Sequence, residues 1–181
     1  MIKKQLLSEY QVSIILNRLA CQLVEIHGDF SETVLIGLQP RGANVLEMLL
    51  SLLKSKGFSN INHGLLDITF FRDDFRRREA PLEANRTKID VLLEGKRVVF
   101  IDDVLYTGRS VRSALDAIHS FGRPKDIELL ILIDRRFSRE LPIQPDYTGK
   151  QVDSLASERV LVDWEKKFGD HSVYLIKPKN E

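Results

Sequence analysis

Two adjacent carboxylates, followed by a turn rich in hydroxyl groups, are the residues of this sequence best suited to chemistry. Asp102 and Asp103 come directly after an apolar run, and the turn Thr107-Gly108-Arg109-Ser110 follows them. Such a turn at a helix N-terminus can direct several backbone N–H groups at one phosphate. The carboxylates are then left to accept hydrogen bonds from sugar hydroxyls. The spacing therefore indicates a site for a ribose 5-phosphate.

A second turn has the composition of an anion site. Gln39-Pro40-Arg41-Gly42 leads from a short apolar run into a segment of helical periodicity, which predicts a concave backbone turn with one guanidinium beside it. This arrangement suits a diphosphate, and the alternative is a plain connection with Arg41 in solvent. The charged residues from Asp67 to Asp74, Arg72 among them, either close over a polyanion or form a solvated loop.

These turns need strands and helices to hold them, and the hydrophobic pattern predicts both. Apolar residues at three- and four-residue steps predict an opening helix over 12–26 that ends at Gly28, with Ser8 and Gln11 spaced as a capping box. Buried strands are expected over 34–38, 65–71, 97–101 and 127–133, and helices over 43–56 and 109–121. This alternation predicts an α/β fold with a mostly parallel sheet, which binds ligands at the carboxyl ends of its strands.

The pattern changes after Asp134, where Pro, Gly and short alternating runs begin. Runs over 160–162 and 173–176 predict a small antiparallel addition at the edge of the sheet. Residues 72–88 carry many charges and predict a long loop or an extended hairpin. We expect one domain over 1–181, with its core over about 9–134.

The composition excludes several classes of function. Lys and Arg total 27 against 26 for Asp and Glu, so a net charge of +1 predicts no overall attraction to nucleic acid or anionic membrane. Cys21 is the single cysteine and forms no internal disulfide, which fits a reducing compartment. The apolar run 129–133 is too short to span a bilayer as a helix. We therefore expect no export segment and a cytoplasmic location.

Other nucleotide and metal motifs fail on their residue types. Gly37 and Gly42 have the separation of a P-loop, but Ala43-Asn44 stands where Lys and Ser or Thr are required. The four histidines lack the spacing of metal ligands, and we assign no metal ligated directly by the protein. Each histidine, like Trp164, is predicted to be surface or core filler.

The block from Val98 to Ser110 resembles the signature of the type I phosphoribosyltransferases, which bind 5-phosphoribosyl-1-diphosphate. Further segments resemble one family in that class, the PyrR family of bacterial pyrimidine operon attenuation regulators with uracil phosphoribosyltransferase activity. These segments are Asp67-Ile68-Thr69 before Arg72-Asp73-Asp74, the block Asp102 to Arg109, and Glu140-Leu141-Pro142-Ile143 leading to Asp146-Tyr147 and Gly149-Lys150. The similarity runs from the opening helix to about Val160.

The resemblance implies a type I phosphoribosyltransferase fold with a small hood formed mainly by about 135–160. It implies a Mg²⁺-dependent reaction of uracil with 5-phosphoribosyl-1-diphosphate that yields UMP and diphosphate. Matching positions imply that Asp102 and Asp103 bind the ribose hydroxyls and that Arg72 and the loop after it cover the reacting centre. The diphosphate would be bound by Gln39, Pro40, Arg41 and Gly42, and the 5-phosphate by Leu105, Tyr106, Thr107, Gly108, Arg109 and Ser110. The base would lie near Asp134 and Arg135.

The resemblance also implies a second partner, the leader RNA of a pyrimidine operon, bound on a basic face of a homodimer or higher homo-oligomer. Arg18, Arg139 and Lys150 are the cations assigned to that face, with Arg139 expected on the outer surface. Gln144 departs from the pattern, because RNA-regulating members tend to carry a basic residue there. Two alternatives stay open: a UMP-sensing RNA-binding attenuator with little catalytic role, and a phosphoribosyltransferase for another base.

Overall fold

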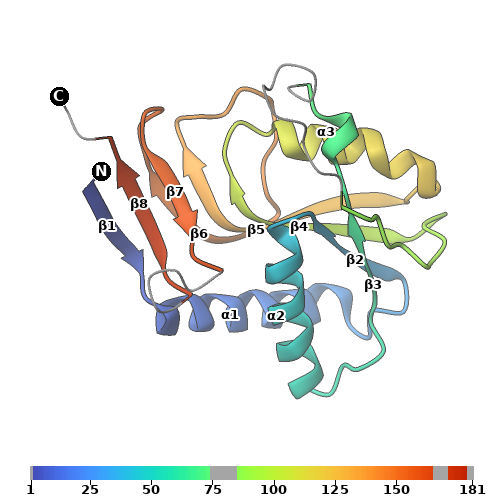
Figure 1. Ribbon diagram of the computed structural model, residues 1–181. Helices are drawn as coiled ribbons and strands as arrows, with labels where there is room; N and C mark the ends of the chain where they lie inside the picture. Colours follow the sequence, from blue (N-terminus) through green and yellow to red (C-terminus); the bar gives the residue numbers. More distant parts are fainter. Residues whose placement is uncertain (1, 74–84, 165–170, 179–181) are drawn as a thin grey trace.

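Five parallel strands form the central sheet of the computed structural model, which describes residues 2–73, 85–164 and 171–178. They lie in the order β3-β2-β4-β5-β6 (Figure 1), with bounds β2 Thr33–Leu38, β3 Asn62–Leu66, β4 Arg97–Leu105, β5 Asp126–Arg136 and β6 Tyr147–Asp153. Every neighbouring pair is parallel, which confirms the predicted α/β fold. All of β2 is buried, as expected for a strand covered on both faces.

Three α-helices cover the two faces of this sheet within the described residues. α1 (Glu9–His27) and α2 (Gly42–Ser55) lie on one face, and α3 (Arg109–Ile118) lies on the other (Figure 1). The capping box of α1 is present, because the Gln11 N–H donates to Ser8 Oγ at 3.3 Å and the Ser8 N–H donates to Gln11 Oε1 at 2.9 Å. Gly28 ends the helix with φ +58°, a conformation that favours glycine. Both predicted ends of α1 are confirmed.

A second, antiparallel sheet lies beside the first in the order β1-β8-β7 (Figure 1), with bounds β1 Ile2–Leu7, β7 Arg159–Val162 and β8 Val173–Lys177. The predicted addition at the edge of the central sheet is wrong in its placement, because β7 and β8 pair with β1 and the edge strand is β6. The strand β1 was not predicted, since three of its residues, Lys3, Lys4 and Gln5, are polar and exposed. The hood over about 135–160 stays a prediction, although β6 within it belongs to the central sheet.

Other elements differ from the predicted bounds for local reasons. The strand expected over 65–71 is Asn62–Leu66, and Thr69–Phe71 forms a short 3₁₀ helix. The Asp67 carboxylate turns the chain here, because it accepts from the Thr69 N–H at 2.8 Å and from the Thr69 hydroxyl at 3.1 Å. β4 runs on to Leu105, so the two aspartates lie inside the strand. A 3₁₀ turn replaces the last part of the helix expected over 109–121.

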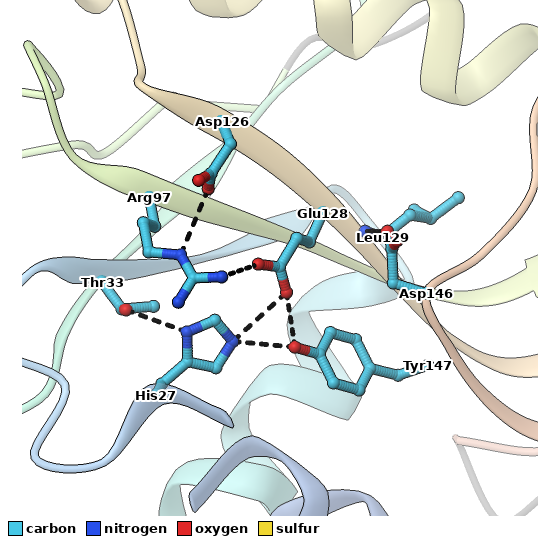
Figure 2. A network of polar contacts seen from close by, with 8 residues as sticks. All are labelled: His27, Thr33, Arg97, Asp126, Glu128, Leu129, Asp146 and Tyr147. Carbon is cyan, nitrogen blue, oxygen red and sulfur yellow. Dashed lines mark hydrogen bonds and ion pairs between the residues drawn. The ribbon is translucent and has the colours of Figure 1, made fainter. Parts of the chain in front are cut away.

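A buried polar network fixes the end of α1 to the amino-terminal ends of the central strands (Figure 2). The His27 ring lies between the Thr33 hydroxyl, 3.1 Å from Nδ1, and the Tyr147 hydroxyl, 2.9 Å from Nε2. Glu128 accepts from the Tyr147 hydroxyl and from Arg97 Nη2, the latter at 2.6 Å. Burial lowers the pKa of His27, so this imidazole is neutral at pH 7. The network lies at the opposite end of β4 from the two aspartates and supports the scaffold.

Candidate active site

A cavity of about 570 Å³ lies at the carboxyl ends of the central strands, where open α/β sheets bind ligands. The predicted site residues that line it are Gln39, Pro40, Arg41, Arg72, Asp102, Asp103, Tyr106, Ser110 and Arg135. The predicted residues outside its lining are Gly42, Leu105, Thr107, Gly108, Arg109 and Asp134. The structure therefore brings the two turns and the aspartate pair together around one space.

Asp102 and Asp103 have different environments although they are adjacent in β4. Asp103 is 3% exposed, and its Oδ2 accepts from Arg41 Nε at 2.6 Å and from Trp164 Nε1 at 3.1 Å. Asp102 Oδ1 accepts from the backbone N–H of Asp103 at 2.8 Å. Burial, and next the neighbouring carboxylate of Asp103, raise the pKa of Asp102 well above its usual range. The pair therefore combines one carboxylate held by a cation with one that takes up a proton readily.

The turn 39–42 is held against the aspartate-bearing strand. Besides its bond to Asp103, Arg41 donates from Nη2 to the Val162 carbonyl of β7 at 2.8 Å. Arg41 is therefore fixed by two acceptors, and the alternative of a guanidinium free in solvent is wrong. At Gly42 a Cβ would come within 2.2 Å of the Ile101 carbonyl oxygen, so glycine permits α2 to begin this close to β4.

The turn from Leu105 to Ser110 joins β4 to α3. Gly108 has φ +93° and directly precedes the helix, which begins at Arg109. The first N–H groups of a helix have no carbonyl partner within it, so they are available to bind an anion. Tyr106 and Ser110 line the cavity, whereas Leu105 is buried in the apolar cluster under α3.

Arg135 and Asp134 were both expected beside the base, but they face different cavities. Arg135 lines the first cavity and is 5% exposed. Its Nε donates to Ser154 Oγ at 2.8 Å, its Nη2 donates to the Glu158 carbonyl at 2.8 Å, and its guanidinium lies 3.9 Å from the Tyr106 ring centre. Asp134 instead lines a separate cavity of about 450 Å³. Burial lowers the pKa of Arg135, which nevertheless stays charged at neutral pH.

Several residues of the site were not predicted. Ile68, Val104 and the segment Ala156 to Val160 also line the cavity. Trp164 packs against the core, as expected, and also donates to Asp103, which was not expected. The segment 156–160 has no motif, and its place follows from the bonds that Arg135 makes to Ser154 just before it and to Glu158 within it. An arginine at the end of a buried strand needs acceptors, and that requirement is the signal that could have revealed this segment.

The three cations assigned to RNA have different surroundings. Arg18 is exposed on α1 and donates to two backbone carbonyls of β6, at 3.1 and 2.5 Å, and Lys150 is exposed on that strand. Arg139 departs from the expected outer position: its side chain is 23% exposed, pairs with Asp134 and donates to the Tyr106 carbonyl at 2.6 Å. Arg139 therefore supports the turn from Leu105 to Ser110.

Arg72 belongs to the described part of the predicted cover. It lines the cavity, and its positive charge is the smallest of the influences on Asp102, where it acts to lower the pKa. Residues 74–84, on which most of the predicted covering loop falls, lie outside the described residues.

Metal clusters and membrane spans are both missing from the part of the chain that the structure describes. No three His, Cys, Asp or Glu side chains gather there as metal ligands. No helix among those residues combines the length and apolar character needed to cross a membrane.

Known proteins match both the sequence and the fold. A family model for the phosphoribosyl transferase domain matches residues 3–166. A relative from Gloeothece citriformis, named Bifunctional protein PyrR, is 42% identical and the alignment covers 96% of this chain and 97% of its own. A relative of the same name from Enterococcus faecalis is 36% identical, with 98% of each chain covered. A solved hypoxanthine-guanine phosphoribosyltransferase from Bacillus anthracis has a TM-score of 0.72 at 20% identity, covering 97% of this chain and 99% of its own.

The parallel sheet, the aspartate pair at its carboxyl edge and the matching family model define a phosphoribosyltransferase with the type I fold. The solved structure supports the fold alone, because its sequence identity is low. Within this class, the chain belongs to the PyrR family, since the relatives of that name align over nearly its whole length. The predicted family is confirmed.

Proposed function

We propose that this chain transfers the 5-phosphoribosyl group of 5-phosphoribosyl-1-diphosphate to uracil, with UMP and diphosphate as products. One observation carries the proposal: the Asp102 and Asp103 pair and residues of both anion-binding turns line a single cavity. The substrate has one chemical group for each of these three features: a phosphate for the turn 105–110, adjacent hydroxyls for the aspartates, and a diphosphate for the turn 39–42. The relatives named Bifunctional protein PyrR support uracil as the base.

The proposed binding mode divides the substrate among separate elements. The turn 105–110 and the start of α3 bind the 5-phosphate, and Asp102 and Asp103 accept hydrogen bonds from the ribose hydroxyls. The turn 39–42 meets the diphosphate. Arg41 and Arg72 both line the cavity and add positive charge there.

The chemistry needs orientation and charge stabilisation more than a covalent nucleophile. Breaking the bond between C1 and the diphosphate leaves positive charge on the sugar and negative charge on the leaving group. Fixed carboxylates orient the sugar, and Arg41 and Arg72 stabilise the departing polyanion. We assign no general base.

Mg²⁺ fits this donor set as part of the substrate complex. Mg²⁺ is commonly held by one or two carboxylates together with substrate phosphates, and Asp102 and Asp103 are carboxylates that line the cavity. When bound, the ion would neutralise charge on the diphosphate.

We place the base beside Arg135 and the segment 156–160, and not beside Asp134. Arg135 uses its guanidinium on Ser154, Glu158 and the Tyr106 ring, so it acts by holding these neighbours in place. Asp134 lines the other cavity and pairs with Arg139. In this placement, backbone N–H and C=O groups of the segment 156–160 bind the edge of the pyrimidine.

Product analysis tests the reaction itself. Purified protein incubated with uracil, 5-phosphoribosyl-1-diphosphate and Mg²⁺ is expected to form UMP and diphosphate in equal amounts, and a chelator should stop both. Samples without uracil measure hydrolysis of the substrate. Diphosphate release that does not depend on any base, or no UMP at all, would reject the proposal.

A second function is favoured by exposed cations on neighbouring elements, Arg18 on α1 and Lys150 on β6. We propose that the leader RNA of a pyrimidine operon binds this region of a homodimer or higher homo-oligomer in the cytoplasm. Arg139 is less suited to RNA because its guanidinium is committed to Asp134 and Tyr106. Filter binding with the protein's own operon leader tests this function, and a transcript of equal length and scrambled sequence is the control.

A further inference from the structure

The segment from Arg139 to Ile143, which we call the clamp, packs along the turn 105–110, the phosphate turn of the proposed function. Arg139 Nη1 donates to the Tyr106 carbonyl at 2.6 Å. The next two backbone N–H groups of the clamp donate to the Thr107 carbonyl at 3.1 and 3.2 Å. Two successive carbonyls of the turn therefore have their partners in this one segment.

The next two residues of the turn also contact the clamp. A Cβ at Gly108 would lie 3.2 Å from Ile143 and 3.4 Å from Leu141, so the backbone of the glycine packs against these side chains. The Arg109 guanidinium pairs with Glu140 at 2.6 Å. Residues 106–109 are thus supported along their whole length by the clamp.

The direction of these bonds determines where the N–H groups of the turn point. In a trans peptide the C=O and the N–H point in opposite directions. Because the clamp binds the carbonyls of Tyr106 and Thr107, the N–H groups of Thr107 and Gly108 are turned away from it. The clamp thereby leaves these donors available on its far side.

We propose that Arg139 is a positioning residue for the phosphate turn, and that the clamp orients the N–H groups that bind the 5-phosphate of substrate and product. This inference rests on the proposed function of the turn. Arg139 suits the role because Asp134, whose side chain is 7% exposed, holds one Nη while the other Nη reaches Tyr106. A lysine has a single ammonium group and lacks this fork, so it would satisfy the two acceptors less well.

Two substitutions with a matched control test the clamp. Arg139→Gln and Arg139→Lys are compared with Arg136→Gln, since Arg136 pairs with exposed Asp153 by a similar two-pronged contact. The readouts are kcat, the Michaelis constant for each substrate and the Kd of ribose 5-phosphate by calorimetry. Ribose 5-phosphate carries the phosphate and hydroxyls without a base or diphosphate.

We expect Arg139→Gln to weaken binding of the phosphoribosyl donor and of ribose 5-phosphate. The KM for the donor and the Kd for ribose 5-phosphate should each rise about tenfold, the effect of losing one hydrogen bond from a charged donor. The KM for uracil should change by less than about twofold. For Arg139→Lys, both constants should lie between those of the parent and those of Arg139→Gln. Arg136→Gln should have the same constants as the parent. A selective loss of this kind separates positioning from a general loss of stability.

Other outcomes would overturn the clamp. One is that the Arg139 and Arg136 variants have the same KM values and the same Kd for ribose 5-phosphate. Another is that Arg139→Gln raises the KM equally for the phosphoribosyl donor and for uracil. A third is that the parent protein does not bind ribose 5-phosphate. If Arg139→Gln does not fold, Ile143→Ala removes packing behind Gly108 and should produce the same selective effect. A parent that binds ribose 5-phosphate but makes no UMP rejects the proposed function alone, and the ribose 5-phosphate affinities then decide for or against the clamp.

Discussion

Arg41 Nε donates to Asp103 Oδ2 at 2.6 Å, which joins the turn proposed for the diphosphate to the carboxylates proposed for the ribose. The contact is a hydrogen bond between charged groups, and the carboxylate is almost fully buried. Trp164, two residues beyond the end of β7, donates to the same oxygen. Asp103 therefore fixes the relative positions of three segments around the cavity.

Replacing Asp103 is expected to lower turnover without unfolding the protein. Asp103→Asn has nearly the same shape, but it removes the charge that holds Arg41 and one acceptor for the ribose. Mispositioned reactants commonly cost about tenfold or more in rate, and we expect a loss of kcat/KM of at least that size. Steady-state kinetics measure it, with exposed Asp116→Asn on α3 as the control. An unchanged rate would remove Asp103 from the site.

Asp102→Asn is expected to stabilise the protein while lowering its activity. The folded-state pKa of Asp102 lies above the unfolded value, so the folded protein binds more protons than the unfolded one in that interval. The free energy of unfolding therefore falls as pH rises from the unfolded to the folded pKa, and the cost is fully present above the folded pKa. A neutral amide avoids this cost.

Thermal unfolding at pH 8 should give Asp102→Asn a higher Tm than the parent, by about 2–4 °C for each 1 kcal/mol by which the free energy of unfolding increases. The difference should shrink toward pH 4, because Asp102 is then protonated in the folded parent. Asp116→Asn again serves as the control, since it removes only a surface pair with Arg112. A variant that melts below the parent at pH 8 would contradict an Asp102 whose pKa is raised in the folded protein.

His27 predicts a pH dependence of stability with the opposite sign. Its folded-state pKa is lowered, chiefly by burial, so the unfolded protein binds the extra proton. The free energy of unfolding should therefore decrease as pH falls below about 6.5, by at most about 1.4 kcal/mol per pH unit from this group. The stability that the neutral ring provides is fully present above that pH.

Denaturant unfolding between pH 5 and pH 8 measures this dependence. His27→Gln should flatten it, since a glutamine cannot titrate in this range. His119→Gln is the matched control, because His119 is exposed just after α3. Parallel curves for the parent and His27→Gln would show that this imidazole does not titrate differently in the two states.

The predictable parts of the fold are those with local signals. The capping box of Ser8 and Gln11 marks the start of α1, and the apolar run before Asp102 marks the central strand. Both signals lie within a few residues of the structure that they predict. β1 could not be found in this way, because its partner β8 lies at the other end of the chain and Lys3 and Lys4 are exposed.

The site shows the same division between local and long-range information. The spacing of Asp102, Asp103 and the turn after them predicted a shared site, and the structure brings Asp102, Asp103, Tyr106 and Ser110 to one cavity. Spacing could not place Arg139, because its role depends on meeting the Tyr106 carbonyl across 33 residues of chain. Trp164 likewise reaches Asp103 across 61 residues, so its type alone indicated only surface or core filler.

RNA binding, if it depends on Arg18 and Lys150, should weaken steeply with salt. Cations that contact phosphates release counterions, so log K should fall with log salt by about 0.7 for each phosphate contacted on a single strand. Lys150→Gln should reduce that slope by about the same 0.7, whereas Lys125→Gln, also exposed, should not. Filter binding over a salt series measures both. No binding to the operon leader at low salt would leave the transferase function alone.

The preference among bases tests the central claim most directly. Initial rates of diphosphate release with 5-phosphoribosyl-1-diphosphate and Mg²⁺ should be measured for uracil, hypoxanthine, guanine, adenine and orotate. We predict that kcat/KM for uracil exceeds each of the others by at least about tenfold, because a site that hydrogen-bonds one base rejects others strongly. A purine or orotate used better than uracil would contradict uracil transfer as the function, while leaving the phosphoribosyltransferase fold in place.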